Sequence, residues 1–222
     1  MTLSVASYLM GIPSKNVNPD KPKIIVNFIE GVWASGDKGE IVCDYNPVDT
    51  DVAVIQGFVH PNSKNSPHLQ LRKNVIEHQH KRNKRTIIVD SNLFLYADKG
   101  NSNKFLRYSY DGIFPNTGEY CNNQPDPARW NLISKRLGIK LKPWTHSGRN
   151  ILICCQRDGG WSMGKTPLLV WLHNTIIDIR KYTDRTIIIR THPGDKKAIK
   201  HYVPAIEQQY KSDPSIKVSP IG

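Results

Sequence analysis

Residues 156–166 (QRDGGWSMGKT) combine the residue types that bind phosphate. Glycines let backbone N–H groups approach phosphate oxygens, and the start of a following helix adds partial positive charge. Basic side chains supply full charge, and a tryptophan is suited to stack on a base or a sugar. We therefore predict that this segment binds the phosphates of a nucleotide through Arg157, Gly159, Gly160, Trp161, Ser162, Lys165 and Thr166.

The same segment also matches the P-loop pattern, from Gly159 to Thr166. Two features argue against a P-loop NTPase or kinase in the loop itself. Bulky Trp161 and Met163 stand where the chain must wrap a phosphate, and a proline follows Thr166 directly. A third is that the next apolar run (RTIIIR) ends in arginine, so it offers no carboxylate for magnesium. The NTPase stays an alternative.

A second group of candidate residues follows an apolar run, in the turn Arg190-Thr191-His192-Pro193. Ligands of open parallel sheets bind at the carboxyl ends of the strands. Arg190 is suited to pair with phosphate, and His192 to donate to a phosphate or ribose oxygen. We therefore predict that Arg190 and His192 belong to the same nucleotide site.

The elements that must position these residues alternate in type. The pattern predicts strands at 150–155, 185–190 and, just beginning, 216–218, with helices at 167–181 and 197–210. This is half of a Rossmann-like sheet, which we expect to be incomplete in this chain. Cys154 and Cys155 lie in the apolar run of the first strand, so both are expected in the core.

The first half shows a similar rhythm after an irregular segment at residues 1–20. Apolar runs predict strands at 23–28 (KIIVNF), 41–44, 51–56 and 85–90, and a helix at 68–82. A further helix is expected at 126–137, capped by Gly138. The sequence therefore predicts an α/β protein with two Rossmann-like halves, an acceptor-type domain at 21–142 and a donor-type domain at 150–222, joined by a linker at 143–149.

Charge and composition point to an anionic partner. The 222 residues carry 31 Lys and Arg against 19 Asp and Glu, a formal net charge of +12. The four cysteines lack metal-site spacing, and no metal is expected. The first 13 residues do not resemble a signal peptide, and no apolar run approaches the roughly 20 residues of a membrane helix, so we expect a cytoplasmic protein without a membrane span.

Several segments resemble a group of glycosyltransferases from phages and marine bacteria. They are RYSYDGIFPNTGEYC (107–121), DPARW (126–130), SGRNILICCQRDGGWSMGK (147–165) and IRKYTDRTIIIRTHPGD (179–195). The His-Pro turn is also similar to that of bacterial capsule and teichoic-acid transferases and sialyltransferases. The resemblance extends over residues 20–222. It implies a GT-B fold, a nucleotide-sugar donor held mainly by the second half, and a contact of His192 with the donor nucleotide.

The resemblance also implies a chemistry that needs no bound metal. The leaving diphosphate would be stabilised by the Gly159–Gly160 turn, Arg157 and Lys165. An inverting transfer further needs a base for the acceptor hydroxyl, which should come from the first half. Asp111 is the first candidate, with Asp90 and Glu119 as alternatives.

The acceptor is left open between two classes. Residues 91–127 are rich in asparagine and tyrosine, which suit a sugar or a nucleobase. An acidic glycan and a modified base of phage DNA, flipped out of its duplex, both fit the charge; a phage-encoded chain would act in the host cytoplasm. A non-enzymatic nucleic-acid-binding protein is a further alternative. Against it, Lys and Arg are scattered along the chain, and the one dense basic run is HQHKRNKR at 78–85.

Overall fold

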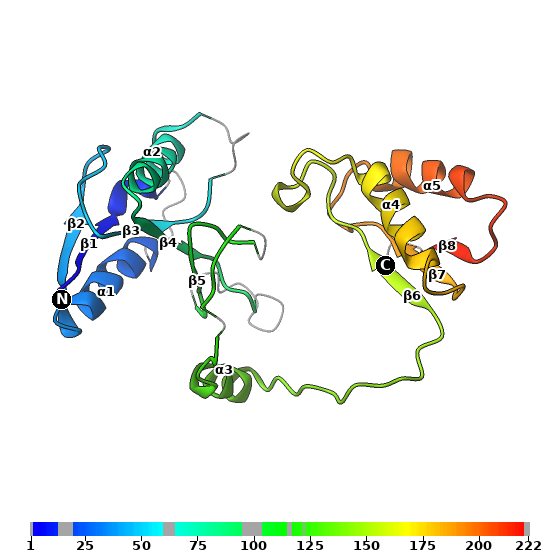
Figure 1. Cartoon of the computed structure of the whole chain (residues 1–222), viewed down its shortest axis with the longest axis horizontal. Helices are drawn as coiled ribbons and strands as arrows, with labels where there is room; N and C mark the ends of the chain where they lie inside the picture. Colours follow the sequence, from blue (N-terminus) through cyan, green and yellow to red (C-terminus); the bar gives the residue numbers. More distant parts are fainter. Residues whose placement is uncertain are drawn as a thin grey trace. The chain divides into compact units, whose positions relative to one another are not determined.

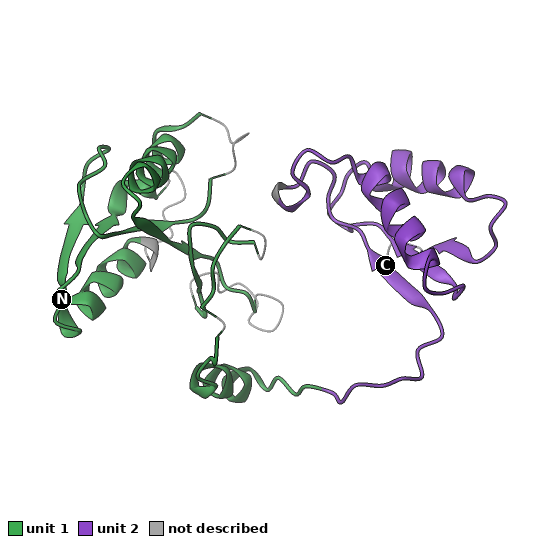
Figure 2. Ribbon diagram, viewed as in Figure 1, with its two compact units in different colours: residues 1–141 green, residues 142–222 purple. Residues whose placement is uncertain are grey.

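The computed structural model describes residues 2–12, 20–59, 65–94, 104–114, 117–121 and 123–219. The chain forms two compact units, residues 1–141 and 142–222 (Figure 2). Residues 139–150 contain neither helix nor strand. Each unit contains a parallel or largely parallel sheet that alternates with helices. The predicted fold class, α/β with two Rossmann-like halves, is therefore confirmed.

The first unit is built on a five-stranded sheet in the order β2-β1-β3-β4-β5 (Figure 1). Four strands are parallel, and the fifth pairs antiparallel with β4. Their bounds are β1 Ser4–Tyr8, β2 Lys38–Val42, β3 Val52–Gln56, β4 Arg85–Asp90 and β5 Arg107–Tyr110. A short 3-10 helix, η1 (Leu9–Gly11), follows β1.

Two helices give this sheet a core on each face. Helix α1 (Asp20–Ala34) packs Ile24, Ile29 and Val32 with one set of strand residues, which includes Val54. Helix α2 (Pro67–Lys81) packs Leu71 and Val75 with the strand residues on the opposite face, which include Ala53 and Ile55. Successive residues of β3 therefore face opposite helices, as the two-residue period of a strand requires.

The expectation that residues 1–20 are irregular is wrong for residues 4–11, because β1 is an inner strand of the sheet and η1 follows it, whereas residues 13–19 lie outside the described residues. It pairs with β2 on one side and β3 on the other, and Val5 to Tyr8 are buried. The run SVASY contains small and polar residues, so it lacks the β-branched signature by which the other strands were predicted.

The predicted strand at 23–28 is also wrong, since these residues form the first half of α1. Their buried members are Ile24 and Ile25, and burial recurs at Ile29 and Val32. This spacing of three to four residues places them on one helical face. The β-branched residues favour a strand locally, but the period over the longer window is helical, and burial against the sheet prevails.

The other predictions for the first unit agree with the structure to within a few residues. β3, α2 and β4 coincide with the expected runs, and β2 overlaps the expected strand at 41–44. Helix α3 (Ala128–Leu137) ends at Gly138, whose φ of 63° is left-handed. Glycine adopts this conformation without the steric cost of a Cβ, and this explains why it ends the helix.

The second unit is a three-stranded parallel sheet in the order β6-β7-β8. Its elements are β6 Ile151–Cys154, 3-10 helix η2 Trp161–Met163, α4 Leu168–Arg180, β7 Ile187–Arg190, π-helix η3 Ala198–Tyr202, α5 Val203–Gln209 and β8 Ile216–Val218. The strands and helices predicted here are confirmed. The core lies between the sheet and helices α4 and α5 (Figure 1).

The two adjacent cysteines do not share the core. Cys155 is buried among the residues that α4 and α5 cover, whereas Cys154 is exposed. Leu152, two residues before Cys154, is also half exposed at 50%. Because side chains alternate between the faces of a sheet, Leu152 and Cys154 share the face opposite to the helices. The expectation that both cysteines are core residues is therefore wrong for Cys154.

Candidate functional site

The loops that follow β6 and β7 meet at Gly194, which lies between two of the predicted site residues. A Cβ at this position would lie 2.7 Å from Nη2 of Arg157 and 3.2 Å from Cε1 of His192. Glycine at this position therefore keeps open the space in which the two side chains approach each other. The structure thus brings Arg157 and His192 together at the carboxyl edge of the sheet, where open α/β sheets bind their ligands.

The backbone fixes the tautomer of His192. The N–H of Gly194 donates a hydrogen bond to Nδ1 of His192 at 2.9 Å. A neutral ring that accepts at Nδ1 carries its proton on Nε2, so it offers an N–H donor there. His192 is half-buried, and the bond at Nδ1 orients its ring. This arrangement suits a phosphate or ribose oxygen as the acceptor.

A partly buried polar network holds the two loops in register. The Asp158 carboxylate accepts hydrogen bonds from the Tyr202 hydroxyl at 2.7 Å and from the Leu168 N–H at 3.0 Å. The N–H of Asp158 in turn donates to Asp195 at 2.9 Å, which also accepts from the Lys197 N–H at 2.9 Å. The Tyr202 bond, followed by the Leu168 bond, holds the pKa of Asp158 below its ordinary value.

Asp158 changes the expected role of the glycine-rich loop, because its carboxylate already occupies the start of α4. The N–H groups of Gly160, Met163 and Thr166 donate to carbonyls within the loop, at 2.9, 2.9 and 3.2 Å. The Asp158 carboxylate and the loop carbonyls therefore already use four of the N–H groups that a phosphate cradle could offer. The exposed basic side chains of Arg157, Lys165 and Arg190 offer further donors to an anion at this edge.

The remaining predicted residues of this site lie around the same loop. Ser162, Lys165 and Thr166 are exposed, and Arg190 is exposed at the end of β7. Gly159 has a φ of +67°. A Cβ at Gly160 would lie 2.8 Å from the Arg157 carbonyl oxygen, so both glycines have a geometric role in the turn. The Trp161 backbone belongs to η2, but its side chain lies outside the described part of the structure.

Sequence reasoning missed Asp158, Asp195 and Tyr202, which position the loops. A signal for Asp158 was present: an aspartate in the loop ahead of a helix is a common partner for the helix N–H groups. No local pattern pointed to Tyr202, because it lies 44 residues from Asp158.

The candidate base Asp111 lies at the amino edge of the first sheet, where the parallel strands begin. It follows β5, which runs antiparallel, and its Oδ1 accepts from the Thr86 N–H at 2.8 Å near the start of β4. Arg85 donates to Asp111 at 2.5 Å and to Glu119 at 2.6 Å. Of the three candidate carboxylates, Asp90 alone stands at the carboxyl end of a parallel strand, where it forms an ion pair with Arg107.

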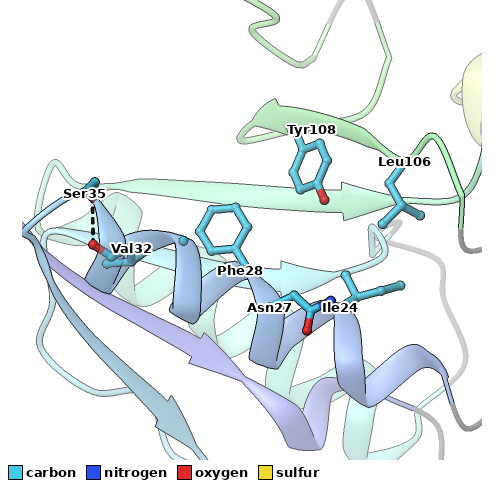
Figure 3. Close-up of a pocket in the computed structure, with 8 residues that line it drawn as sticks. Ile24, Asn27, Phe28, Val32, Ser35, Leu106 and Tyr108 are labelled. Carbon is cyan, nitrogen blue, oxygen red and sulfur yellow. Dashed lines mark hydrogen bonds between the residues drawn. The ribbon is translucent and has the colours of Figure 1, made fainter. Parts of the chain in front are cut away.

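The first unit also contains a groove of about 630 Å³ between α1 and β5. Figure 3 shows Phe28 on α1 and Tyr108 on β5 facing the same space, and their ring centroids are 6.0 Å apart. Burial raises the pKa of the Tyr108 hydroxyl. Tyr108 belongs to the Asn- and Tyr-rich stretch, of which residues 95–103, 115–116 and 122 lie outside the described residues.

The described residues contain neither a membrane-spanning helix nor a metal-binding cluster. No helix in them is both long and apolar enough to cross a membrane. Nor do they bring together three or more His, Cys, Asp or Glu side chains in a way that could hold a metal ion. In comparisons with known proteins, no family model, no curated protein and no solved structure matches the chain.

Proposed function

We propose that this chain is a glycosyltransferase whose second unit binds the nucleotide of a sugar donor without a metal ion. The supporting observation is the meeting of Arg157 and His192 at Gly194, at the carboxyl ends of β6 and β7. A guanidinium pairs with phosphate through two parallel hydrogen bonds, and the Nε2–H of His192 is available to a second oxygen. The sugar-transfer chemistry itself comes from the resemblance of the four sequence segments.

In this proposal the acceptor hydroxyl oxygen attacks the anomeric carbon of the donor sugar. The bond from that carbon to the phosphate oxygen breaks, and the acceptor proton passes to a base. The negative charge of the leaving phosphate is stabilised by Arg157 and Lys165. Asp158 already takes the first N–H of α4, so we assign the larger part of this role to the two side chains.

Asp90 is the better-placed candidate for the base. It lies at the carboxyl edge of the first sheet, whereas Asp111 and Glu119 share Arg85 at the amino edge. The groove between Phe28 and Tyr108 offers aromatic surface for an acceptor sugar or base. An acidic glycan or a modified base of phage DNA remains the acceptor class that the net charge favours.

The P-loop alternative receives less support from the geometry. Helix α4 begins at Leu168, after the Gly-Lys-Thr run that opens the helix of a P-loop protein, and its first N–H is bound to Asp158. Non-enzymatic binding of nucleic acid rests on the net charge alone.

Titration calorimetry of the full chain with UDP, GDP and CMP tests the proposal. We expect saturable binding of at least one of them that is unchanged by a chelator. ATP with magnesium provides the comparison with the NTPase alternative. Magnesium-dependent ATP binding that Lys165→Ala abolishes, with no binding of the other nucleotides, would contradict the transferase and favour the NTPase.

A further inference from the structure

Arg72 on α2 is a buried cation at the carboxyl edge of the first sheet. The residue is only 8% exposed. Its side chain contacts Gly11, after β1, and Gly57, after β3, and the charge of Asp90 at the end of β4 acts on it. β1, β3 and β4 are neighbours in the sheet, so the ends of three adjacent parallel strands converge on one guanidinium.

The Nε of the guanidinium is held by a hydrogen bond, but most of its donors have no acceptor among the described residues. Nε donates to the Gly11 carbonyl oxygen at 2.7 Å. Neither Nη atom has a hydrogen-bond acceptor among the residues that the structure describes. Gly57 has a φ of +87°, and a Cβ there would lie 2.7 Å from Nη1. Glycine at position 57 therefore leaves the space in which the Nη groups lie.

Among the described residues, the charges around Arg72 leave an excess of positive charge. Burial lowers the pKa of Arg72 to about 10, and the nearby Asp90 opposes this shift. Asp90, however, already forms an ion pair with Arg107. Burial, with the charge of Arg72 as a second cause, also lowers the pKa of His68, and a histidine, whether neutral or protonated, offers Arg72 no counter-charge. A buried cation without a full counter-charge is costly unless an anion completes the site.

We propose that the Nη groups of Arg72 bind the oxygens of a phosphate group at the carboxyl edge of the first sheet. The planar fork of arginine matches phosphate through paired hydrogen bonds, and this edge is where open α/β sheets bind ligands. The phosphate is either the free ion or a group on a larger molecule. The site lies wholly in the first unit, so it does not depend on nucleotide binding by the second.

Arginine side-chain NMR tests this site directly. In the full chain labelled with ¹⁵N-arginine, the buried and hydrogen-bonded Nε–H of Arg72 should give a protected signal, which Arg72→Lys identifies by its loss. Inorganic phosphate should shift this signal in a saturable way, and chloride at the same ionic strength should not. A signal that does not move during the phosphate titration would overturn the proposal.

Further experiments test which phosphate the site binds and where in the chain it lies. Phenyl phosphate that binds more tightly than inorganic phosphate would identify a phosphate group on a larger molecule, and the opposite order would identify the free ion. Arg157→Ala should leave the shift of the Arg72 signal unchanged; its loss in this variant would place the phosphate in the second unit and refute the site. Arg72→Lys, if folded, should weaken phosphate binding measured by calorimetry about tenfold.

Should Arg72→Lys fail to fold, the wild-type chain still provides a test of this phosphate site. Hydrogen exchange at the backbone amides of Gly11 and Gly57 should slow when phosphate is added, because the anion would tie down the guanidinium that both glycines contact. Unchanged exchange at both glycines at saturating phosphate would also count against the site.

Discussion

The hydroxyl of Tyr202 donates a hydrogen bond to the carboxylate of Asp158 at 2.7 Å, and this bond joins the loop after β6 to the helix after β7. The second oxygen of Asp158 accepts from the first N–H of α4. Arg157 is the neighbour of Asp158 in the chain, and its side chain reaches Gly194 beside His192. The pair therefore controls how the two candidate nucleotide-binding side chains are presented.

Tyr202→Phe should destabilise the second unit while it keeps the aromatic ring in the core. The variant loses a hydrogen bond to a charged group, and we expect a cost of about 1.5–3 kcal/mol in the free energy of unfolding. Urea unfolding of the full chain measures this cost. Tyr182→Phe is the matched control, because Tyr182 is 87% exposed and should give no change. Equal stability of both variants would show that the Tyr202 bond has no structural role.

The contribution of Asp158 should depend on pH in the acid range. Its folded pKa lies below the ordinary value of 3.8, first because of the Tyr202 bond and then because of the Leu168 N–H. The stabilisation is therefore fully present above that value and is lost as the pH falls through the lower folded pKa. The stability difference between wild type and Asp158→Asn should shrink on acidification below pH 3.8. A difference that is constant with pH would contradict this assignment.

The two adjacent cysteines should differ sharply in reactivity. Cys154 is exposed, whereas Cys155 is buried and burial raises its pKa to about 11. Alkylation requires an accessible thiolate, so iodoacetamide at neutral pH should modify Cys154 and leave Cys155 intact. Peptide mass spectrometry distinguishes the two sites. Equal modification of both in the folded chain would contradict the strand alternation at the end of β6.

Gly118→Ala and Gly31→Ala should have opposite effects on the first unit. A Cβ at Gly118 would overlap the carbonyl oxygen of Gly112, and we expect a loss of about 1–3 kcal/mol. Gly31 lies inside α1 and has nothing within 4 Å of its Cβ position, so alanine there should add about 0.5–1 kcal/mol. Thermal unfolding of both variants measures the pair. A stabilising Gly118→Ala would refute the close approach of the two glycine backbones.

The elements with a clear local period could be predicted from the sequence, and those determined by packing could not. The buried runs at β3, β4, β6 and β7 are short and rich in β-branched residues, so they were found. The same residue types in α1 led to a strand, because a six-residue window shows composition better than period. β1 was missed because small residues fit an inner strand without an obvious signature.

The sequence pointed to two residues that the structure brings together, but not to the partners that hold their loops. Arg157 and His192 could be chosen because each follows a predicted strand of a parallel sheet. The occupation of the α4 start by Asp158 depends on a hydroxyl 44 residues away, which no local pattern contains. The position of Asp111 at the amino edge depends on the antiparallel direction of β5, which the α/β rhythm did not predict.

The most direct test of the nucleotide site is a comparison of charge-matched variants in binding to UDP, GDP and CMP. Arg157→Ala and His192→Ala should each lower the affinity for the nucleotide that binds by about tenfold or more, because each variant removes a hydrogen bond to an anion. Arg149→Ala and His201→Ala remove the same side-chain types from exposed positions of the second unit and should bind like the wild type. Equal affinity in all four variants, or no binding of any nucleotide by the wild-type chain, would contradict the account.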